Sequence, residues 1–360
     1  MLGFSIFLNE DWSQEKESYV NQMADIGFEG VFTSLHIPED DVSKYNERLT
    51  SLLEIVRARN LRLMIDISGD ALKNIGLSLD EPQAIFESGI SGLRADDGID
   101  FKTIANLSQY LTVGLNASTL TESDYEQLIY HNANFSNLEV WHNYYPRPNT
   151  GLDEKWFYRK NDWLKSKRFK VCAFVPGDDN LRLPLYETLP TLEIHRSGHP
   201  LSSALSLTRD YLVDDVYVGD PGISDATCQQ FNEFLQRKIL LLHASSINKK
   251  WDSYIFKDHQ NRLDVSRDVI RSEQSRIIHK QNDIQPENNI ARRKGSITID
   301  NHLYLRYKGE LQIVKRELPA DAKVNVIGQV IDKDLPLLDF IEDGTKFIIA
   351  AIKEAHHESK

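Results

Sequence analysis

Short runs of apolar, often β-branched residues alternate with amphipathic helical stretches over the first two-thirds of the chain. Helices are predicted, for example, at Ser13–Ile26, where Gly27 provides a C-terminal stop, and at Ser224–Leu241. The apolar runs are mostly continuous, which is typical of parallel strands that helices cover on both faces. Eight such strands are predicted, at residues 2–8, 30–35, 61–67, 92–95, 111–115, 138–142, 169–175 and 215–218.

This repetition favours a closed (β/α)₈ TIM barrel over its alternative, a doubly wound open sheet. Eight units in roughly 240 residues match the typical size of such barrels, about 250 residues. Residues 191–195 also have a strand-like pattern. We assign them to a long insertion after the seventh strand, because Pro184 and Pro190 bracket the segment before them.

The pattern changes after about residue 248. Residues 249–293 are polar and show little periodicity, and an alternating pattern then predicts strands with turns at Asp300-Asn301 and Lys308-Gly309. We therefore predict two domains, a barrel at 1–247 and a smaller, mostly antiparallel β-domain at 248–360. The predicted strands of the second domain are 296–299, 302–307, 310–316 and 323–330.

Composition and charge exclude several classes of partner. The formal net charge of −12 disfavours nucleic acid, because phosphate backbones are bound by basic surfaces. Two cysteines, Cys172 and Cys228, are too few for a disulfide framework and fit a reducing compartment. The N-terminus lacks the basic segment of a signal peptide, and no later run is long enough to span a bilayer. We expect a cytoplasmic protein without a membrane partner, and the sequence leaves a homo-oligomer open.

Carboxylates follow the third and fourth strands, at the barrel end where active sites lie. Asp66 ends the third strand, and Asp96-Asp97 follow the fourth. Neighbouring carboxylates disfavour each other's ionisation, so one can act as an acid while the other stays a carboxylate. Glycoside hydrolysis requires this division, and we take Asp96, Asp97 and Asp66 as catalytic candidates. Alternatively, one of the pair caps the helix that begins near Asp100, and Asp66 is simply buried and hydrogen-bonded.

The sixth strand leads into a loop that is dense in polar and aromatic side chains. Prolines on both sides of Arg147 keep its backbone extended. Glu193, His195 and Arg196 alternate with apolar residues further on, and exposed charges without a binding role are the alternative there. The predicted substrate-binding residues are Asn116, His142, Tyr145, Arg147, Glu193, His195, Arg196 and Asp220.

The sequence predicts neither a metal nor a cofactor. His36, His142 and His195 lack the spacing of known metal motifs, and the chain has no P-loop and no Gly-x-Gly-x-x-Gly segment. Residues 219–224 follow the eighth strand, where barrels often hold phosphate, but Asp220 would repel an anion there.

Several motifs resemble those of the 6-phospho-N-acetylmuramidases (MupG-type, glycoside hydrolase family 170). The similar stretches are Leu-Gly-Phe-Ser-Ile-Phe at 2–7, Asn-Tyr-Tyr-Pro-Arg-Pro-Asn-Thr-Gly-Leu at 143–152, Leu-Pro-Thr-Leu-Glu-Ile-His-Arg at 189–196, Val-Tyr-Val-Gly-Asp at 216–220, Gly-Ser-Ile-Thr-Ile-Asp-Asn at 295–301 and Val-Asn-Val-Ile-Gly at 324–328. The resemblance implies a TIM barrel followed by a cyclophilin-like β-domain. It also implies an intracellular glycosidase that splits a phosphorylated amino-sugar disaccharide from peptidoglycan turnover, releasing N-acetylmuramic acid 6-phosphate and N-acetylglucosamine.

Such a substrate carries a phosphate and a lactyl carboxylate, so an acidic protein needs local arginines to bind it. Arg147 and Arg196 are the expected clamps, because a guanidinium group can bind either anion through two hydrogen bonds. The acetamido group of the substrate could itself attack the anomeric carbon, and retaining and inverting routes also stay open. The alternative functions are a non-catalytic phosphosugar-binding protein and a prolyl isomerase activity of the β-domain, although a shared fold does not carry function.

Overall fold

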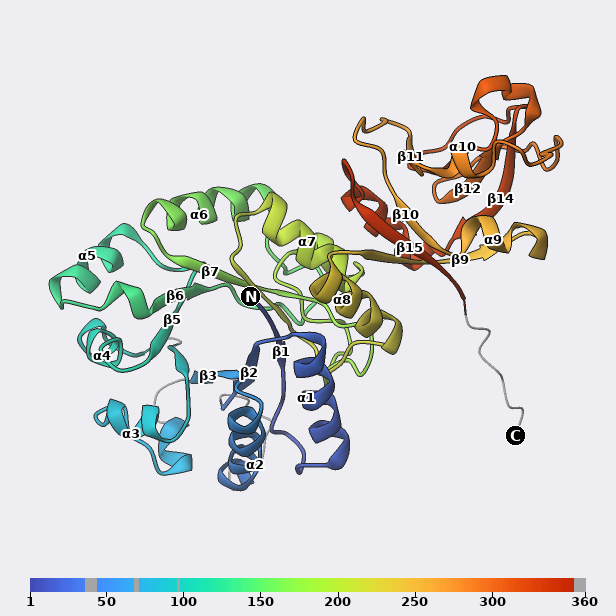
Figure 1. The fold of residues 1–360 in the computed structure, drawn as a ribbon. Coiled ribbons are helices and arrows are strands. Elements are labelled where there is room, and N and C mark those ends of the chain that lie inside the picture. Colours follow the sequence, from blue (N-terminus) through green and yellow to red (C-terminus); the bar gives the residue numbers. More distant parts are fainter. Residues whose placement is uncertain (36–43, 68–70, 96–97, 353–360) are drawn as a thin grey trace. The chain divides into compact units, whose positions relative to one another are not determined.

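Eight parallel strands close into a barrel in the first part of the chain (Figure 1). The computed structural model describes residues 1–35, 44–67, 71–95 and 98–352. Each strand pairs with the next, and β1 pairs with β8, so the predicted barrel is confirmed. The strands are β1 (Leu2–Ser5), β2 (Gly30–Ser34), β3 (Arg62–Ile67), β4 (Gly92–Ala95), β5 (Thr112–Asn116), β6 (Leu138–Trp141), β7 (Lys170–Val175) and β8 (Asp215–Val218).

Helices alternate with these strands around the barrel (Figure 1). The first begins at the predicted place, where the Ser13 side chain accepts a hydrogen bond from the backbone of Lys16, and it ends at Gly27 with a φ of 111°. Among the described residues, no helix is both long and apolar enough to cross a membrane. The helices are α1 (Gln14–Ile26), α2 (Tyr45–Ala58), α3 (Pro82–Glu87), α4 (Phe101–Leu107), α5 (Glu122–Tyr130), α6 (Glu154–Ser166), α7 (Pro200–Asp210) and α8 (Asp225–Arg237), with 3₁₀ turns at Ala71–Ile75, Phe135–Asn137 and Glu193–His195.

Side chains inside the barrel form layers of different chemistry. Alternate residues of a strand point to the same side, so β3 presents Arg62, Met64 and Asp66 to the interior in turn. The middle of the barrel is aromatic, and a side chain at Gly3 would collide with the ring of Tyr217, 2.1 Å from its Cε1 atom. The described core cluster there consists of Phe32, Met64, Trp141, Cys172, Phe174 and Tyr217. The interior is thus a packed core, with polar side chains at its two ends.

The chain divides into two compact units, Met1–Cys228 and Gln229–Lys360. The second unit contains a seven-stranded sheet in the order β10-β15-β9-β14-β12-β13-β11, in which only the β9–β15 pair is parallel among the described strands. A second, mostly antiparallel domain is therefore confirmed. Its strands are β9 (Leu240–Ser246), β10 (Asp258–Gln260), β11 (Val269–Arg271), β12 (Ser296–Asp300), β13 (Leu311–Val314), β14 (Val324–Val330) and β15 (Lys346–Ala351).

Short helical segments connect these strands. They are the 3₁₀ turns η5 (Lys249–Trp251), η6 (His302–Tyr307) and η7 (Asp332–Phe340) and the helices α9 (Asp252–Ile255) and α10 (Ser275–Ile278). The prediction of a strand at 302–307 is wrong. Its apolar and polar residues do alternate, but the Asn301 side chain accepts a hydrogen bond from the backbone of Leu303 and starts a 3₁₀ turn.

The helix predicted to run to Leu241 ends earlier. Lys238 has a φ of 56°, a left-handed conformation that an α-helix cannot continue through. The apolar residues that follow form β9, whose partners β14 and β15 belong to the second sheet. This strand lies before residue 247, after which the domain boundary was predicted.

Candidate functional site

Three polar residues lie side by side at the carboxyl ends of β2, β3 and β4. In the strand register Ser34 is the partner of Asp66, and Asp66 is the partner of Arg94. Strand partners point to the same side, so the three side chains enter one layer of the barrel interior. This layer lies two residues beyond the aromatic core, at the barrel end that forms active sites.

Asp66 is held from two directions. Nη1 of Arg94 lies 2.5 Å from Oδ1 of Asp66, and the Ser34 hydroxyl donates to Oδ2 at 3.1 Å. Arg94 also donates from Nη2 to the Asn143 side-chain oxygen. Arg94 is only 4% exposed, whereas the Asp66 side chain keeps 13% of its surface open. A fixed carboxylate with one face open is suited to act on a bound substrate.

The Nε atom of Arg94 adds a second unusual feature. It is buried and has no hydrogen-bond partner among the described residues. An unsatisfied buried donor costs roughly 1–3 kcal/mol, and such groups are often found at functional sites. Ser34, Asp66, Arg94 and Asn143 therefore form the strongest candidate site in the barrel, and we call these four residues the mouth cluster.

A cavity of about 390 Å³ opens beside the segments that follow β1, β7 and β8. Arg182 lines it, with its guanidinium carbon 4.1 Å from the centre of the Phe7 ring. The same guanidinium donates to the Tyr144 hydroxyl at 2.7 Å. No ion pair to Arg182 is found among the described residues, so its charge is available to an anion. Glu10, Lys16 and Asp179 also line this cavity, which therefore mixes both signs of charge.

The loop that contains Arg147 is braced by Arg196 and Glu193. All five N–H groups of the Arg196 guanidinium are used. They donate to the backbone oxygens of Tyr145, Arg147, Glu187 and Thr188 and to the Glu193 carboxylate. Glu193 also accepts from the backbone of Asn149 and Gly151, at 2.8 and 2.7 Å. These hydrogen bonds and the ion pair with Arg196 lower the pKa of Glu193 to about 2.

Within the described part of the chain, the Arg147 side chain lacks the internal hydrogen bonds and the ion pair that the Arg196 side chain makes. It is exposed and makes no hydrogen bond or ion pair with the described residues, while the Arg147 backbone oxygen accepts hydrogen bonds from Arg196 and Thr150. Tyr145 is half-buried, and burial raises the pKa of its hydroxyl, which also lies beside Ser118. The predicted Arg147 thus remains a candidate anion clamp, whereas the geometry of Arg196 favours a bracing role.

The predicted histidines lie outside the barrel interior. His142 is fully buried between β6 and α6, where its Nε2 lies 2.7 Å from the Asn161 side-chain oxygen and its Nδ1 lies 3.1 Å from the Ser118 hydroxyl. Burial lowers its pKa to about 3. His195 packs against Tyr211, and burial lowers its pKa to about 4. Both are neutral at pH 7, and their contacts favour structural roles.

The side chains of two further predicted residues, Asp220 and Asn116, accept hydrogen bonds from backbone N–H groups. Asp220 is completely buried and accepts hydrogen bonds from the backbone N–H groups of Gly177 and Leu189, at 2.8 and 2.9 Å. Burial raises the pKa of Asp220, and these hydrogen bonds oppose the rise. Asn116 ends β5 and accepts from the backbone N–H of Ser118. Asp96 and Asp97 lie outside the described residues, directly after the last residue of β4.

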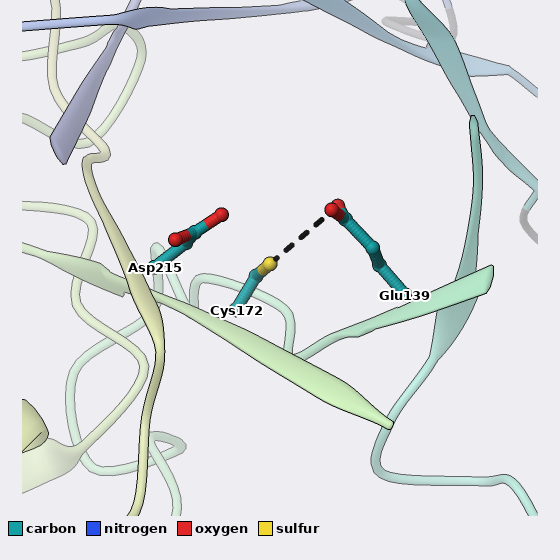
Figure 2. Close-up of side chains that lie close together, drawn as sticks. All are labelled: Glu139, Cys172 and Asp215. Atoms are coloured by element: carbon teal, nitrogen blue, oxygen red, sulfur yellow. Dashed lines mark hydrogen bonds between the residues drawn. The ribbon is translucent and has the colours of Figure 1, made fainter. Parts of the chain in front are cut away.

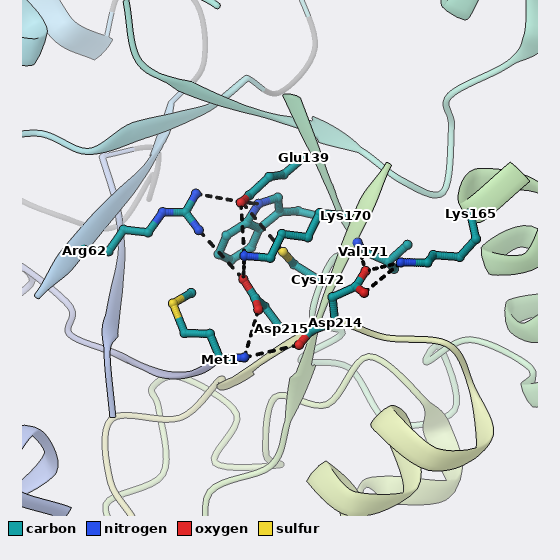
Figure 3. Close-up of polar contacts among 10 residues, drawn as sticks. Met1, Arg62, Glu139, Lys165, Lys170, Val171, Cys172, Asp214 and Asp215 are labelled. Carbon is teal, nitrogen blue, oxygen red and sulfur yellow. Dashed lines mark hydrogen bonds and ion pairs between the residues drawn. The ribbon is translucent and has the colours of Figure 1, made fainter. Parts of the chain in front are cut away.

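The opposite end of the barrel contains the one group of possible metal ligands found among the described residues. The ligand atoms of Glu139, Cys172 and Asp215 lie within 4.8 Å of one another (Figure 2). Three cations already occupy this position, and one of them is the N-terminal ammonium group of Met1, 3.0 Å from Asp215. Arg62 pairs with Glu139 at 2.7 Å, and Lys170 pairs with Asp215 at 2.5 Å (Figure 3). The side chains therefore neutralise each other and do not fit a metal ion, and this end of the barrel is a structural base.

Some members of the site were missed by the sequence analysis. Arg94, Asn143 and Arg182 were not among the predicted site residues, and neither was Ser34. One pattern could have identified the first two. Each lies two residues after an inward-facing position, Gly92 for Arg94 and Trp141 for Asn143. For Arg182 the sequence contains no comparable pattern, because its neighbours come from distant segments.

Comparison with known proteins adds independent evidence. The model of the N-terminal domain of the 6-phospho-N-acetylmuramidases matches residues 2–233, and the model of the C-terminal domain matches residues 239–350. A conserved Enterococcus faecalis protein described as having an unknown function is 44% identical, with a TM-score of 0.91, over 98% of this chain and 96% of that chain. An uncharacterised B. cereus protein is 26% identical, with a TM-score of 0.73, over 97% and 99%. A search of curated proteins found no match.

Proposed function

Because the chain belongs to the 6-phospho-N-acetylmuramidase family and is therefore a glycosidase, we propose that it hydrolyses the bond between N-acetylmuramic acid 6-phosphate and N-acetylglucosamine. The observation that carries this proposal is the mouth cluster. It presents a carboxylate, fixed by Arg94 and Ser34, at the open end of the barrel. A glycosidase needs such a group beside the anomeric carbon.

We assign Asp66 to the stabilisation of positive charge at the anomeric carbon. In the reaction an acid protonates the glycosidic oxygen, the bond from that oxygen to the anomeric carbon breaks, and positive charge spreads over the ring. A carboxylate that is already positioned needs no reorganisation to stabilise this charge. Asn143, on the other side of Arg94, is placed to bind a substrate hydroxyl or the acetamido group.

Asp96 is the proposed acid, with Asp97 as its neighbour. They follow β4, two and three residues after Arg94 in the sequence. After the glycosidic bond breaks, water adds to the anomeric carbon and gives its proton to the deprotonated acid. If the acetamido group attacks first, Asp96 still protonates the departing glycosidic oxygen while Asp97 orients the acetamido group, and water then opens the cyclic intermediate and gives a proton to Asp96.

Two arginines are proposed to bind the anionic groups of the substrate. Arg147 is exposed on a loop whose backbone is fixed, and Arg182 lines the cavity of about 390 Å³. Their charges are not used by carboxylates among the described residues, in contrast to that of Arg196. A cation without an internal partner can bind phosphate without first breaking an ion pair. The remaining predicted residues are proposed to contribute indirectly, by fixing the segments around this site. These residues are Asn116, His142, Tyr145 and Asp220.

The proposed cellular location of the enzyme follows from its proposed substrate. A sugar of this kind is phosphorylated on uptake, and we therefore place the enzyme in the cytoplasm, in the recycling of cell-wall fragments.

The test of the proposed function is product release by purified protein and by the Asp96→Asn variant. Wild-type protein should release N-acetylglucosamine from the phosphorylated disaccharide. The variant should fold normally and bind the substrate, but release product at a rate lower by about 100-fold or more, since loss of a general acid typically costs 10²–10⁴ in rate. Near-normal turnover by the variant would remove Asp96 from the mechanism.

A further inference from the structure

The C-terminal unit contains a buried carboxyl group, that of Asp300, with no hydrogen-bond or ion-pair partner in the described part of the chain. Asp300, at the end of β12, is 5% exposed. Its backbone N–H donates to Glu310 and its backbone oxygen accepts from Gly309, but no described residue makes a hydrogen bond or an ion pair with its side chain. Burying a carboxyl group without a partner costs free energy, so a protein keeps one there only when something compensates for it.

This side chain lines a cavity. A hollow of about 270 Å³ is bounded by strands β11 to β14 and by η6, and Asp300 forms part of its wall. The volume lies just below the roughly 300–1,000 Å³ of clefts that hold drug-sized molecules. The size therefore suits a single sugar ring or a similar small molecule better than a chain.

Charges of both signs surround the cavity. Arg271 makes two hydrogen bonds with Glu310, at 2.7 and 3.2 Å, and both residues line the cavity. Arg292, also in the wall, uses Nε and Nη2 on the backbone oxygen of Pro319 and keeps its remaining N–H groups. A net cation would be repelled by the two arginines, and a net anion would meet the Glu310 carboxylate and would hold Asp300 in its protonated form. A neutral molecule with several hydroxyl or amide groups can satisfy both signs.

Aromatic rings form the remaining wall. Tyr304 and Tyr307 of η6 both line the cavity, with ring centres 6.3 Å apart. Between them Leu305 has a φ of 54° and a ψ of −115°, a conformation that is strained for a residue with a branched side chain, and its side chain is 81% exposed. Strained residues of this kind are concentrated at ligand-binding segments. Here the strained turn is the segment that presents the two tyrosines to the cavity.

We propose that this cavity is a second saccharide site that binds a neutral amino sugar of the N-acetylglucosamine type, separately from the barrel. Asp300 accepts hydrogen bonds from two neighbouring hydroxyls of the sugar, and Arg292 donates to a ring substituent. The apolar face of the sugar stacks on Tyr304 or Tyr307. The site does not depend on the barrel chemistry, so its failure would leave the proposed hydrolase intact.

The protonation state of Asp300 provides a measurable sign of binding at this cavity. Burial, together with the nearby Glu310 and Asp321 carboxylates, raises the pKa of Asp300 to about 8, and Arg292 and Arg271 oppose this rise. The carboxyl group is therefore mostly protonated at pH 7 in the free protein. Hydroxyl donors favour the ionised form, so binding of the sugar should release a proton.

The experiment is calorimetric titration of the full chain with N-acetylglucosamine at pH 7, in two buffers of different ionisation enthalpy. Binding should release up to one proton. The Asp300→Asn variant, which keeps the shape of the side chain, should bind about tenfold more weakly and release none. Tyr307→Ala, at a partly exposed position, should also weaken binding. Asp343→Asn, at an exposed position of the same unit, should bind as wild type does.

Two further probes test the ligand class. Glucosamine, with its ammonium group, and N-acetylglucosamine 6-phosphate should bind this site more weakly than the neutral sugar. Absence of any titratable binding of N-acetylglucosamine would overturn the proposal. Binding that Asp300→Asn and Tyr307→Ala leave unchanged would equally overturn it, because the sugar would then bind outside this cavity.

Discussion

At the scale of single residues, the ion pairs of a charged side chain help to distinguish the groups that we propose act on the substrate from those that stabilise the fold. Asp66 is paired with Arg94 but keeps an open face, whereas the charges of Arg196 and Glu193 are used within the protein. Asp66 could be found from the sequence because an acid that ends an apolar strand is unusual. The pairing of Arg196 with Glu193 could not, because charge alone does not show whether a side chain points inward or outward.

Asp66 provides the first prediction at this scale. Asp66→Asn should lower kcat by about 100-fold or more, because it removes the charge opposite the anomeric carbon and leaves Arg94 without its counter-charge. Substrate affinity should change little. Asp162→Asn, at an exposed position of α6, is the matched control and should retain wild-type kcat. The measurement is the steady-state kinetics of both variants. A kcat of Asp66→Asn equal to that of Asp162→Asn would exclude a catalytic role for Asp66.

His142 provides the second prediction. Its pKa is about 3 in the folded protein, against an ordinary value of 6.5, so between these values only the unfolded state binds the proton. Stability should therefore fall as the pH decreases below 6.5. From pH 7 to pH 5 this one residue should cost about 2 kcal/mol, since each pH unit is worth roughly 1.4 kcal/mol per proton.

The measurement is urea denaturation at both pH values. The His142→Gln variant should be less stable than wild type at pH 7, but it should lose about 2 kcal/mol less on acidification. The other histidines contribute equally to both proteins, so the difference isolates His142. The same pH dependence in wild type and variant would show that His142 is protonated in the folded state.

At the scale of elements, the barrel strands could be predicted well, whereas β9, β10, β11 and β15 of the second sheet were not predicted. All eight barrel strands were found from continuous apolar runs, because burial on both faces leaves a strong pattern. The 3₁₀ turn at 302–307 was mistaken for a strand because its alternation mimics a half-buried one. The helix α8 was extended into β9, because apolar residues continue past the left-handed Lys238 and the sequence alone does not show that turn.

The braced loop makes a prediction at this scale. Arg196→Ala should lower the free energy of unfolding by roughly 2–3 kcal/mol, at the upper end of ordinary point substitutions, because it frees four backbone oxygens and leaves Glu193 without its cation. It should also raise KM, since the Arg147 loop loses its fixed backbone. Denaturation and kinetics together test this, and unchanged stability would contradict the bracing role.

Arg147 is the contrasting case. Arg147→Ala should leave the free energy of unfolding within about 0.5 kcal/mol of wild type, because its exposed side chain makes no hydrogen bond or ion pair with the described residues. It should raise KM for the phosphorylated substrate by about tenfold or more, since a charge-assisted hydrogen bond is worth roughly 1.5–3 kcal/mol. A variant with normal KM would show that another residue, such as Arg182, binds the anion alone.

At the scale of the whole molecule, the side chains inside the barrel change in chemistry along its axis. Ion pairs of Arg62 and Lys170 close one end, aromatic rings fill the middle, and the mouth cluster occupies the other end. The chain as a whole is acidic, so an anionic substrate must be recognised by a few local arginines rather than by the overall field. This requirement agrees with the finding that Arg147 and Arg182 form no ion pair among the described residues.

The most direct measurement of the central claim is kcat/KM for the phosphorylated disaccharide compared with its unphosphorylated form. The wild-type enzyme should release N-acetylglucosamine from the phosphorylated sugar and act on the other about 100-fold or more less efficiently, since a lost charged contact costs roughly 2–5 kcal/mol. Equal rates on both sugars would contradict phosphate recognition by the arginines. Binding without release from either would contradict the proposed hydrolysis itself.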